Sequence, residues 1–150
     1  MIQRKQSLWL VLVAILAALT FVFPFFTGIR TTVAEGLTDV NSTADILSGG
    51  ELYALSNIVL MLVTAAIAIL ALVSIFMYKN RTQQRTLCFV NLILSFGLIF
   101  LYFYYKSNKY SGGTIALTSV FTFLIPVFIV LAIRGINNDI KLLKSVDRLR

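Results

Sequence analysis

The stretch "NIVLMLVTAAIAILALVSIFMY", residues 57–78, contains no Asp, Glu, Lys or Arg. A helix of about 20 apolar residues crosses the roughly 30 Å hydrocarbon core of a bilayer. Three further uncharged, apolar runs cover about residues 7–26, 86–105 and 114–133. None of these runs alternates apolar with polar side chains, as a strand of a membrane barrel would. The sequence therefore predicts an all-α integral membrane protein with four transmembrane helices.

The composition supports a membrane protein with one domain. Of the 150 residues, 59% are hydrophobic and 13% are charged, whereas a soluble domain is about 45–50% apolar and about 25% charged. Because the connections after the second and third runs are short, we expect an up-down bundle of four helices. We assign residues 1–150 to this domain, with an extracytoplasmic loop over 27–56 and a cytoplasmic tail over 134–150 that forms an amphipathic helix.

The basic residues indicate the orientation of the chain. Lys and Arg number 13 against 6 Asp and Glu, which gives a net charge of +7. These residues lie in the gaps between the apolar runs, and this placement argues against a nucleic-acid-binding surface. Two basic residues precede the first run, three separate the second run from the third and five follow the fourth, whereas three lie on the opposite side. By the positive-inside rule, we expect both termini to be cytoplasmic.

The start of the chain also has features of a secretory signal peptide, because the basic residues of "MIQRK", residues 1–5, precede an apolar run. The apolar core of a signal peptide is about 7–15 residues long, which is shorter than this run. In addition, "TTVAE", residues 31–35, is a poor cleavage site. We therefore expect the first run to remain in the protein as a transmembrane helix.

Polar residues inside the spans are the usual indication of function in a membrane protein. A proline at position 126 cannot donate to the carbonyl of Thr122, so this carbonyl needs another partner. We interpret the polar residues as hydrogen-bonding groups that fix the packing of the third and fourth spans, at about 0.6–2 kcal/mol per bond. A hinge or a small polar pathway is the alternative. This intramembrane polar cluster comprises Asn91, Ser95, Thr118, Thr122 and Pro126.

The segment "NNDIKLLKSVDRLR", residues 137–150, has the spacing of an amphipathic helix that continues from, or is kinked at, Gly135. A helix lying in the lipid headgroups is one interpretation. However, Asp139 and Asp147 project onto the apolar side of the helix, where contact with lipid would bury a charge. We therefore predict that the tail docks on protein through four residues, namely Asp139, Ile140, Leu143 and Asp147.

Two protein surfaces could receive the tail. One is the loop between the second and third spans, which is basic, and the other is a separate partner protein. The basic side of the tail would then face anionic lipid or solvent. In a third interpretation, the tail only anchors the chain through its positive charge. The basic inner surface predicted from these positions comprises Lys79, Arg81, Arg85, Lys141, Lys144 and Arg148.

The sequence offers few groups for catalysis. It contains no histidine, and its single cysteine, Cys88, has no second cysteine for a disulfide or a CxxC zinc motif. The acidic residues of the first loop match no known metal-binding spacing. We therefore expect that the protein is not an enzyme and has no cofactor or metal.

The two ends of the chain carry a family resemblance. "MIQRKQSLWL", residues 1–10, and "IRGINNDIKLLKSVDRLR", residues 133–150, resemble the ends of a Bacteroidetes family of small four-span membrane proteins. That family is known as domain of unknown function 4293, and the resemblance extends over essentially the whole chain. It implies a protein of the bacterial inner membrane, which agrees with the orientation inferred above. It implies no catalytic residues.

These observations favour a non-enzymatic accessory or scaffolding protein that binds another membrane or membrane-proximal protein, with the tail as the docking element. One alternative is a small homo-oligomeric transporter or channel subunit, although such proteins usually have ionisable residues or broken helices near the midplane. A second alternative is a membrane enzyme that acts on lipid or quinone. The expected partners are membrane lipids and either another membrane protein or further copies of the chain, and not nucleic acid.

Overall fold

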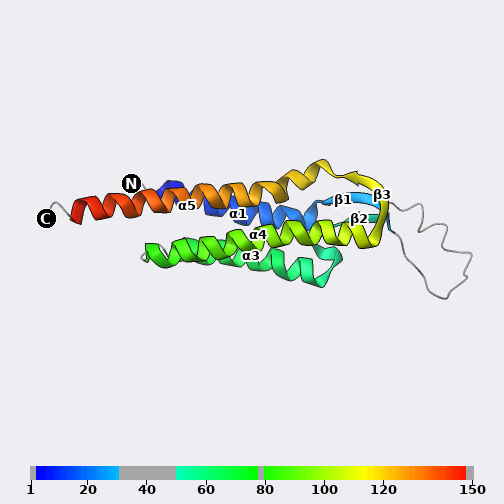
Figure 1. Cartoon of the computed structure of the whole chain (residues 1–150), viewed down its shortest axis with the longest axis horizontal. Coiled ribbons are helices and arrows are strands. Elements are labelled where there is room, and N and C mark those ends of the chain that lie inside the picture. The colour runs from blue at the N-terminus through cyan, green and yellow to red at the C-terminus, as the bar shows by residue number, and fades with distance from the viewer. Residues whose placement is uncertain (1–2, 31–49, 78–79, 148–150) are drawn as a thin grey trace, which may run out of the picture.

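The computed structural model describes residues 3–30, 50–77 and 80–147, and it is mostly helical (Figure 1). Three of its helices contain stretches that are long and apolar enough to cross a membrane, and α1 contains a shorter apolar stretch. The structure is therefore that of a helical membrane protein. The helices are α1 (Gln3–Val22), α3 (Ile58–Phe76), α4 (Arg81–Lys109) and α5 (Val120–Asp147).

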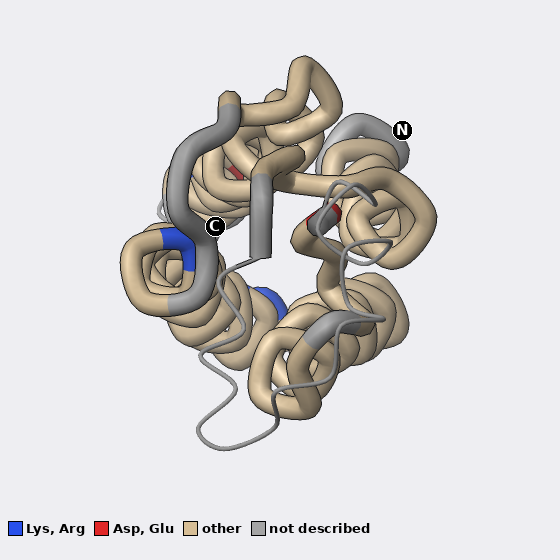
Figure 2. The backbone as a smooth tube through the Cα atoms, turned by 90° about the vertical axis from the view of Figure 1, so that its right-hand side faces the viewer, with Lys and Arg blue, Asp and Glu red and all other residues tan. Residues whose placement is uncertain are grey.

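The four helices lie side by side along the long axis of the molecule. Helix α1 packs against α3 and α5, and α4 packs against the same two helices, so each helix contacts two others. The view along the long axis shows the four helices around a common centre (Figure 2). The beginning of α1 and the end of α5 lie at the same end of the molecule, which we call the terminal end.

The opposite end, which we call the sheet end, contains a three-stranded antiparallel sheet. Its strands are β1 (Phe26–Arg30), β2 (Gly50–Leu52) and β3 (Tyr110–Ile115), with β1 between the other two. Phe26 of β1 lies opposite Leu52 on one side and Ile115 on the other. Two 3₁₀ turns, Ala54–Ser56 and Leu117–Ser119, lead from the sheet into α3 and α5.

The predicted start of the fourth span at Thr114 is wrong, because Thr114 lies in β3 and α5 begins only at Val120. Two consecutive glycines, Gly112 and Gly113, disfavour a helix there. Pairing with β1 then satisfies the backbone groups of this segment, as a strand requires. The third predicted span, residues 86–105, lies within the longer helix α4.

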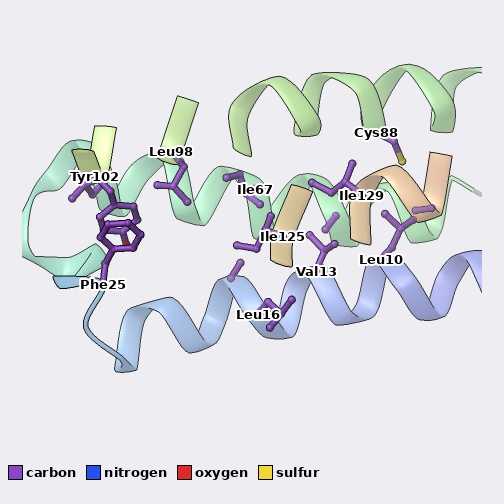
Figure 3. Close-up of a cluster of buried hydrophobic side chains, with 14 of the residues drawn as sticks. Leu10, Val13, Leu16, Phe25, Ile67, Cys88, Leu98, Tyr102, Ile125 and Ile129 are labelled. Carbon is purple, nitrogen blue, oxygen red and sulfur yellow. The ribbon is translucent and has the colours of Figure 1, made fainter. Parts of the chain in front are cut away.

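The buried residues that form the core recur at regular intervals along the helices. On α4 the buried positions recur at intervals of three and four residues, which places them on one side of a helix. Apolar side chains from all four helices meet between them (Figure 3). Many outward-facing residues are also apolar, including Phe100, which is 70% exposed. An apolar outer surface suits contact with lipid, since a soluble protein rarely exposes large apolar areas. The buried positions of α4 are Gln84, Cys88, Asn91, Ser95, Leu98 and Tyr102.

Helix α5 joins the fourth apolar run to most of the predicted tail. It is a single helix from Val120 to Asp147, and it continues through Pro126 and Gly135. The predicted helical tail is therefore confirmed as far as Asp147, as a continuation of the span. Arg148 lies outside the described residues, as do residues 31–49 of the predicted first loop.

Candidate functional site

The terminal end contains an ion pair between two helices. Nη1 of Arg81, at the start of α4, lies 3.2 Å from Oδ2 of Asp139 on α5. The Asp139 side chain is 4% exposed and that of Arg81 is 23% exposed. The contact is an ion pair without a hydrogen bond, because this carboxylate oxygen has no hydrogen-bond partner among the described residues. Attraction between opposite charges is stronger away from water, so the pair links α5 to the start of α4.

This ion pair joins the tail to one of the two surfaces considered for it. Asp139 contacts Arg81 of its own chain, in the loop region between the second and third predicted spans. Ile140, the next residue, is partly buried against the core. Lys141 is exposed, and Leu142 is 52% exposed. Beyond Ile140, α5 therefore presents both a cationic and an apolar side chain.

The remaining residues predicted for this surface are only partly described. Arg85 lies one turn after Arg81 on α4 and is half-buried. Lys79 lies outside the described residues, and so do several tail side chains, although their backbone belongs to α5. These tail side chains are those of Leu143, Lys144 and Asp147.

Gln84 and Ser74 form a second polar contact at the terminal end, and the sequence analysis did not predict it. Nε2 of Gln84 donates to the carbonyl oxygen of Ser74 at 3.0 Å. The last carbonyls of a helix lack partners within that helix, so Gln84 caps the end of α3. Gln84 lies three residues after Arg81 and four before Cys88. This helical spacing is the signal that would have placed it on the inward side of α4.

The predicted intramembrane polar cluster does not form as one group. Nδ2 of Asn91 donates to the carbonyl oxygen of Ile67 at 3.4 Å, so it links α4 to α3 and not to α5 as expected. The hydroxyl of Ser95 donates to Leu92 of its own helix at 2.7 Å. Thus neither of these two bonds joins the third predicted span to the fourth.

The members predicted on the fourth span lie at different places in the structure. Thr118 is in the 3₁₀ turn at the sheet end, and its hydroxyl donates to the carbonyl oxygen of Pro24. Thr122 and Pro126 are buried in α5. Thr118 therefore helps to hold the sheet end, which is a different part of the molecule from the site of the Asn91 bond.

Aromatic side chains fill the sheet end. Phe25 stacks on Tyr102 of α4, with ring centroids 4.3 Å apart and planes 17° apart, as the close-up shows (Figure 3). The ring of Phe25 also lies 6.0 Å from that of Phe123 on α5. Nζ of Lys106 lies 4.9 Å from the centre of the Phe26 ring, within cation–π range. Apolar and ring contacts therefore hold the sheet end together with the strand pairing and the Thr118 hydrogen bond.

The comparisons with known proteins bear on the family of the chain. Within the part of the chain that the structure describes, there is no group of three or more His, Cys, Asp or Glu residues that could hold a metal ion. No curated protein and no solved structure matches the chain. A family model does match it, over residues 2–149, which confirms the resemblance carried by the two ends. The chain therefore belongs to the family described as domain of unknown function (DUF4293).

Proposed function

We propose that the protein is a non-enzymatic accessory or scaffolding protein of the bacterial inner membrane, with four membrane spans and both termini cytoplasmic. The end of α5 would dock another membrane or membrane-proximal protein. One observation carries this proposal. Helix α5 extends past the other helices at the terminal end, and the Arg81–Asp139 ion pair holds it just before it leaves them (Figure 1).

The proposal counts α1 as a fourth span. Its apolar stretch, Ser7–Val22, corresponds to about 24 Å at 1.5 Å per residue, which is shorter than the roughly 30 Å hydrocarbon core, and a bilayer accommodates such a mismatch by local thinning. Helix α1 also packs along α3 and α5, both of which contain stretches long enough to cross a membrane. Because α1 packs against these two spans, we place it at the same depth in the bilayer.

The direction of α5 favours a protein partner over a lipid surface. From Asp139 the helix continues to Asp147, which adds about 12 Å at 1.5 Å per residue. It continues in the direction of the span, whereas a helix that binds headgroups lies in the plane of the membrane. To lie in the plane of the membrane, the end of α5 would have to bend away from the span, but α5 is one continuous helix from Val120 to Asp147.

The chemistry of the extending segment also suits protein docking. Leu142 offers an apolar contact and Lys141 a positive charge, so a partner with an apolar centre and an acidic edge would complement them. Since Asp139 is already paired within the chain, the partner would contact residues beyond it, including Leu143 and Asp147.

The test is purification of the tagged protein from its native membranes in mild detergent, followed by mass spectrometry. The full chain is compared with a chain that ends at Ile140, which removes Lys141 and Leu142 but retains Asp139 and Ile140 and so preserves their contacts. We expect a stoichiometric partner with the full chain and its loss with the shortened chain, at equal protein level and equal melting temperature. A partner retained by the shortened chain, or no partner with either chain, would refute the docking role of α5.

A further inference from the structure

The inward side of α4 carries a row of polar residues, interrupted by the apolar Cys88, from the terminal end toward the middle of the molecule, which we call the polar stripe. It begins at Arg81, passes the buried residues Gln84 and Cys88 and reaches the buried residues Asn91 and Ser95. The spacing of three and four residues places all five on one side of the helix. The stripe spans fourteen residue steps, or about 21 Å at 1.5 Å per residue.

Most polar atoms of the stripe have partners. Gln84 donates to the carbonyl of Ser74, Ser95 donates within its own helix and Arg81 contacts Asp139. Asn91 differs. Its Nδ2 makes a long bond of 3.4 Å to Ile67, and its Oδ1 is buried without a hydrogen-bond donor among the described residues. A buried amide oxygen without a hydrogen-bond donor destabilises the folded protein, so a donor at this position would be stabilising.

Two further polar residues lie within one helical turn of the two residues that the Asn91 bond joins. Ser95 follows Asn91 by four residues on α4, and Thr64 precedes Ile67 by three residues on α3. Both side chains are buried, at 1% and 0% exposure. Each hydroxyl donates to a carbonyl of its own helix, which leaves its oxygen able to accept a bond. A small donor beside Asn91 could therefore bind the amide oxygen and one of these hydroxyl oxygens.

We propose that the polar stripe binds water, with one water molecule donating to Oδ1 of Asn91 and to the hydroxyl oxygen of Ser95 or Thr64. Water fits this site because a buried water typically makes about three hydrogen bonds and can fill both acceptor positions. The site lacks the several oxygen ligands that a cation requires. In this proposal water enters from the terminal end, where Arg81 is partly exposed. This inference does not depend on the docking role of α5.

Nuclear magnetic resonance of the full chain in lipid nanodiscs tests the proposal. The protein is labelled with ¹⁵N asparagine and ¹⁵N leucine, and the Asn91 side-chain signal is identified by its loss in Asn91→Ser. We expect a cross-peak between water and the side-chain NH₂ of Asn91. The backbone amide of Leu98, which is the next inward position beyond the stripe and is fully buried, should give none. Asn80, which is exposed, is the positive control.

Exchange into D₂O provides a second readout. The side-chain NH₂ of Asn91 should exchange at least about tenfold faster than the Leu98 amide, because water reaches only the first of the two without local unfolding. Absence of the water cross-peak at Asn91 would overturn the proposal. A cross-peak of equal strength at Leu98 would overturn it as well, since water would then not be confined to the stripe.

Discussion

At the sheet end, Phe25 stacks on Tyr102 and three strands join the segments that connect the helices. At the terminal end, Arg81 pairs with Asp139 and Gln84 caps α3. The same four helices are therefore closed by apolar and backbone contacts at one end and by charged and polar contacts at the other. Among the described residues, no buried side-chain nitrogen or oxygen of the sheet end lacks a hydrogen-bond partner. The terminal end, in contrast, holds α5 at Asp139 and lets the helix extend beyond it.

The largest expected effect concerns the sheet end. Phe25→Ala should lower the free energy of unfolding by about 3–5 kcal/mol, because it removes a fully packed ring and leaves a cavity. Chemical unfolding in detergent, followed by circular dichroism, measures this change. Phe123→Ala is the control, since Phe123 is 38% exposed and should cost clearly less. Equal losses for the two variants would show that stacking on Tyr102 does not hold this end.

At the terminal end, Asp139→Ala should lower the free energy of unfolding by about 2–3 kcal/mol. Removing one partner of a buried ion pair usually costs more, but Arg81 is partly exposed and regains some hydration. The double variant Arg81→Met with Asp139→Leu should recover most of the loss, because apolar side chains can replace such a pair. If the double variant were as unstable as the sum of its single variants, the two charges would not interact.

The cap on α3 should have a smaller effect. Gln84→Leu should cost about 1 kcal/mol, because it deletes a hydrogen bond to a buried carbonyl. Gln83→Leu is a matched control, since Gln83 is exposed and its amide oxygen accepts a bond from the exposed Asn80. Thermal unfolding of the two variants side by side measures the difference. A Gln83 effect as large as that of Gln84 would argue against the cap.

The smallest expected effect is that of Lys106. Lys106→Met should cost about 0.5–1 kcal/mol, which is the range of a cation–π contact at a partly exposed site. Lys106→Arg keeps a cation over the Phe26 ring and should be nearly neutral. Melting temperatures of the three proteins in the same detergent would show whether they follow this order. An equal loss for methionine and arginine would assign the effect to packing of the lysine chain.

The sequence predicts the helices well where a long apolar run decides them. The run over residues 57–78 closely matches α3, because crossing a membrane requires a stretch of fixed length. The sheet was missed, since Ile115 pairs with Phe26 from a distant part of the chain and no local pattern reveals such a pairing. Gly112 and Gly113 were the available signal that the fourth helix begins later than Thr114.

Part of the candidate site was predictable because helical spacing is a local pattern in the sequence. Helical spacing placed Asp139 on the apolar side of the tail, and the structure buries it. Spacing along a single helix could not show which cation it meets, because that depends on how α4 and α5 pack. Gln84 was missed because it precedes the predicted start of the third span, whereas α4 begins five residues earlier, at Arg81.

The most direct test of the docking role compares the two ends in living cells. A photocrosslinking amino acid is placed at Leu142, beyond Asp139, or at Leu117, which is 89% exposed at the sheet end. We predict one discrete protein adduct from position 142 and none of the same mass from position 117. Adducts that are equal at both positions, or no adduct at position 142 under conditions where the protein is folded, would contradict a docking role for the end of α5.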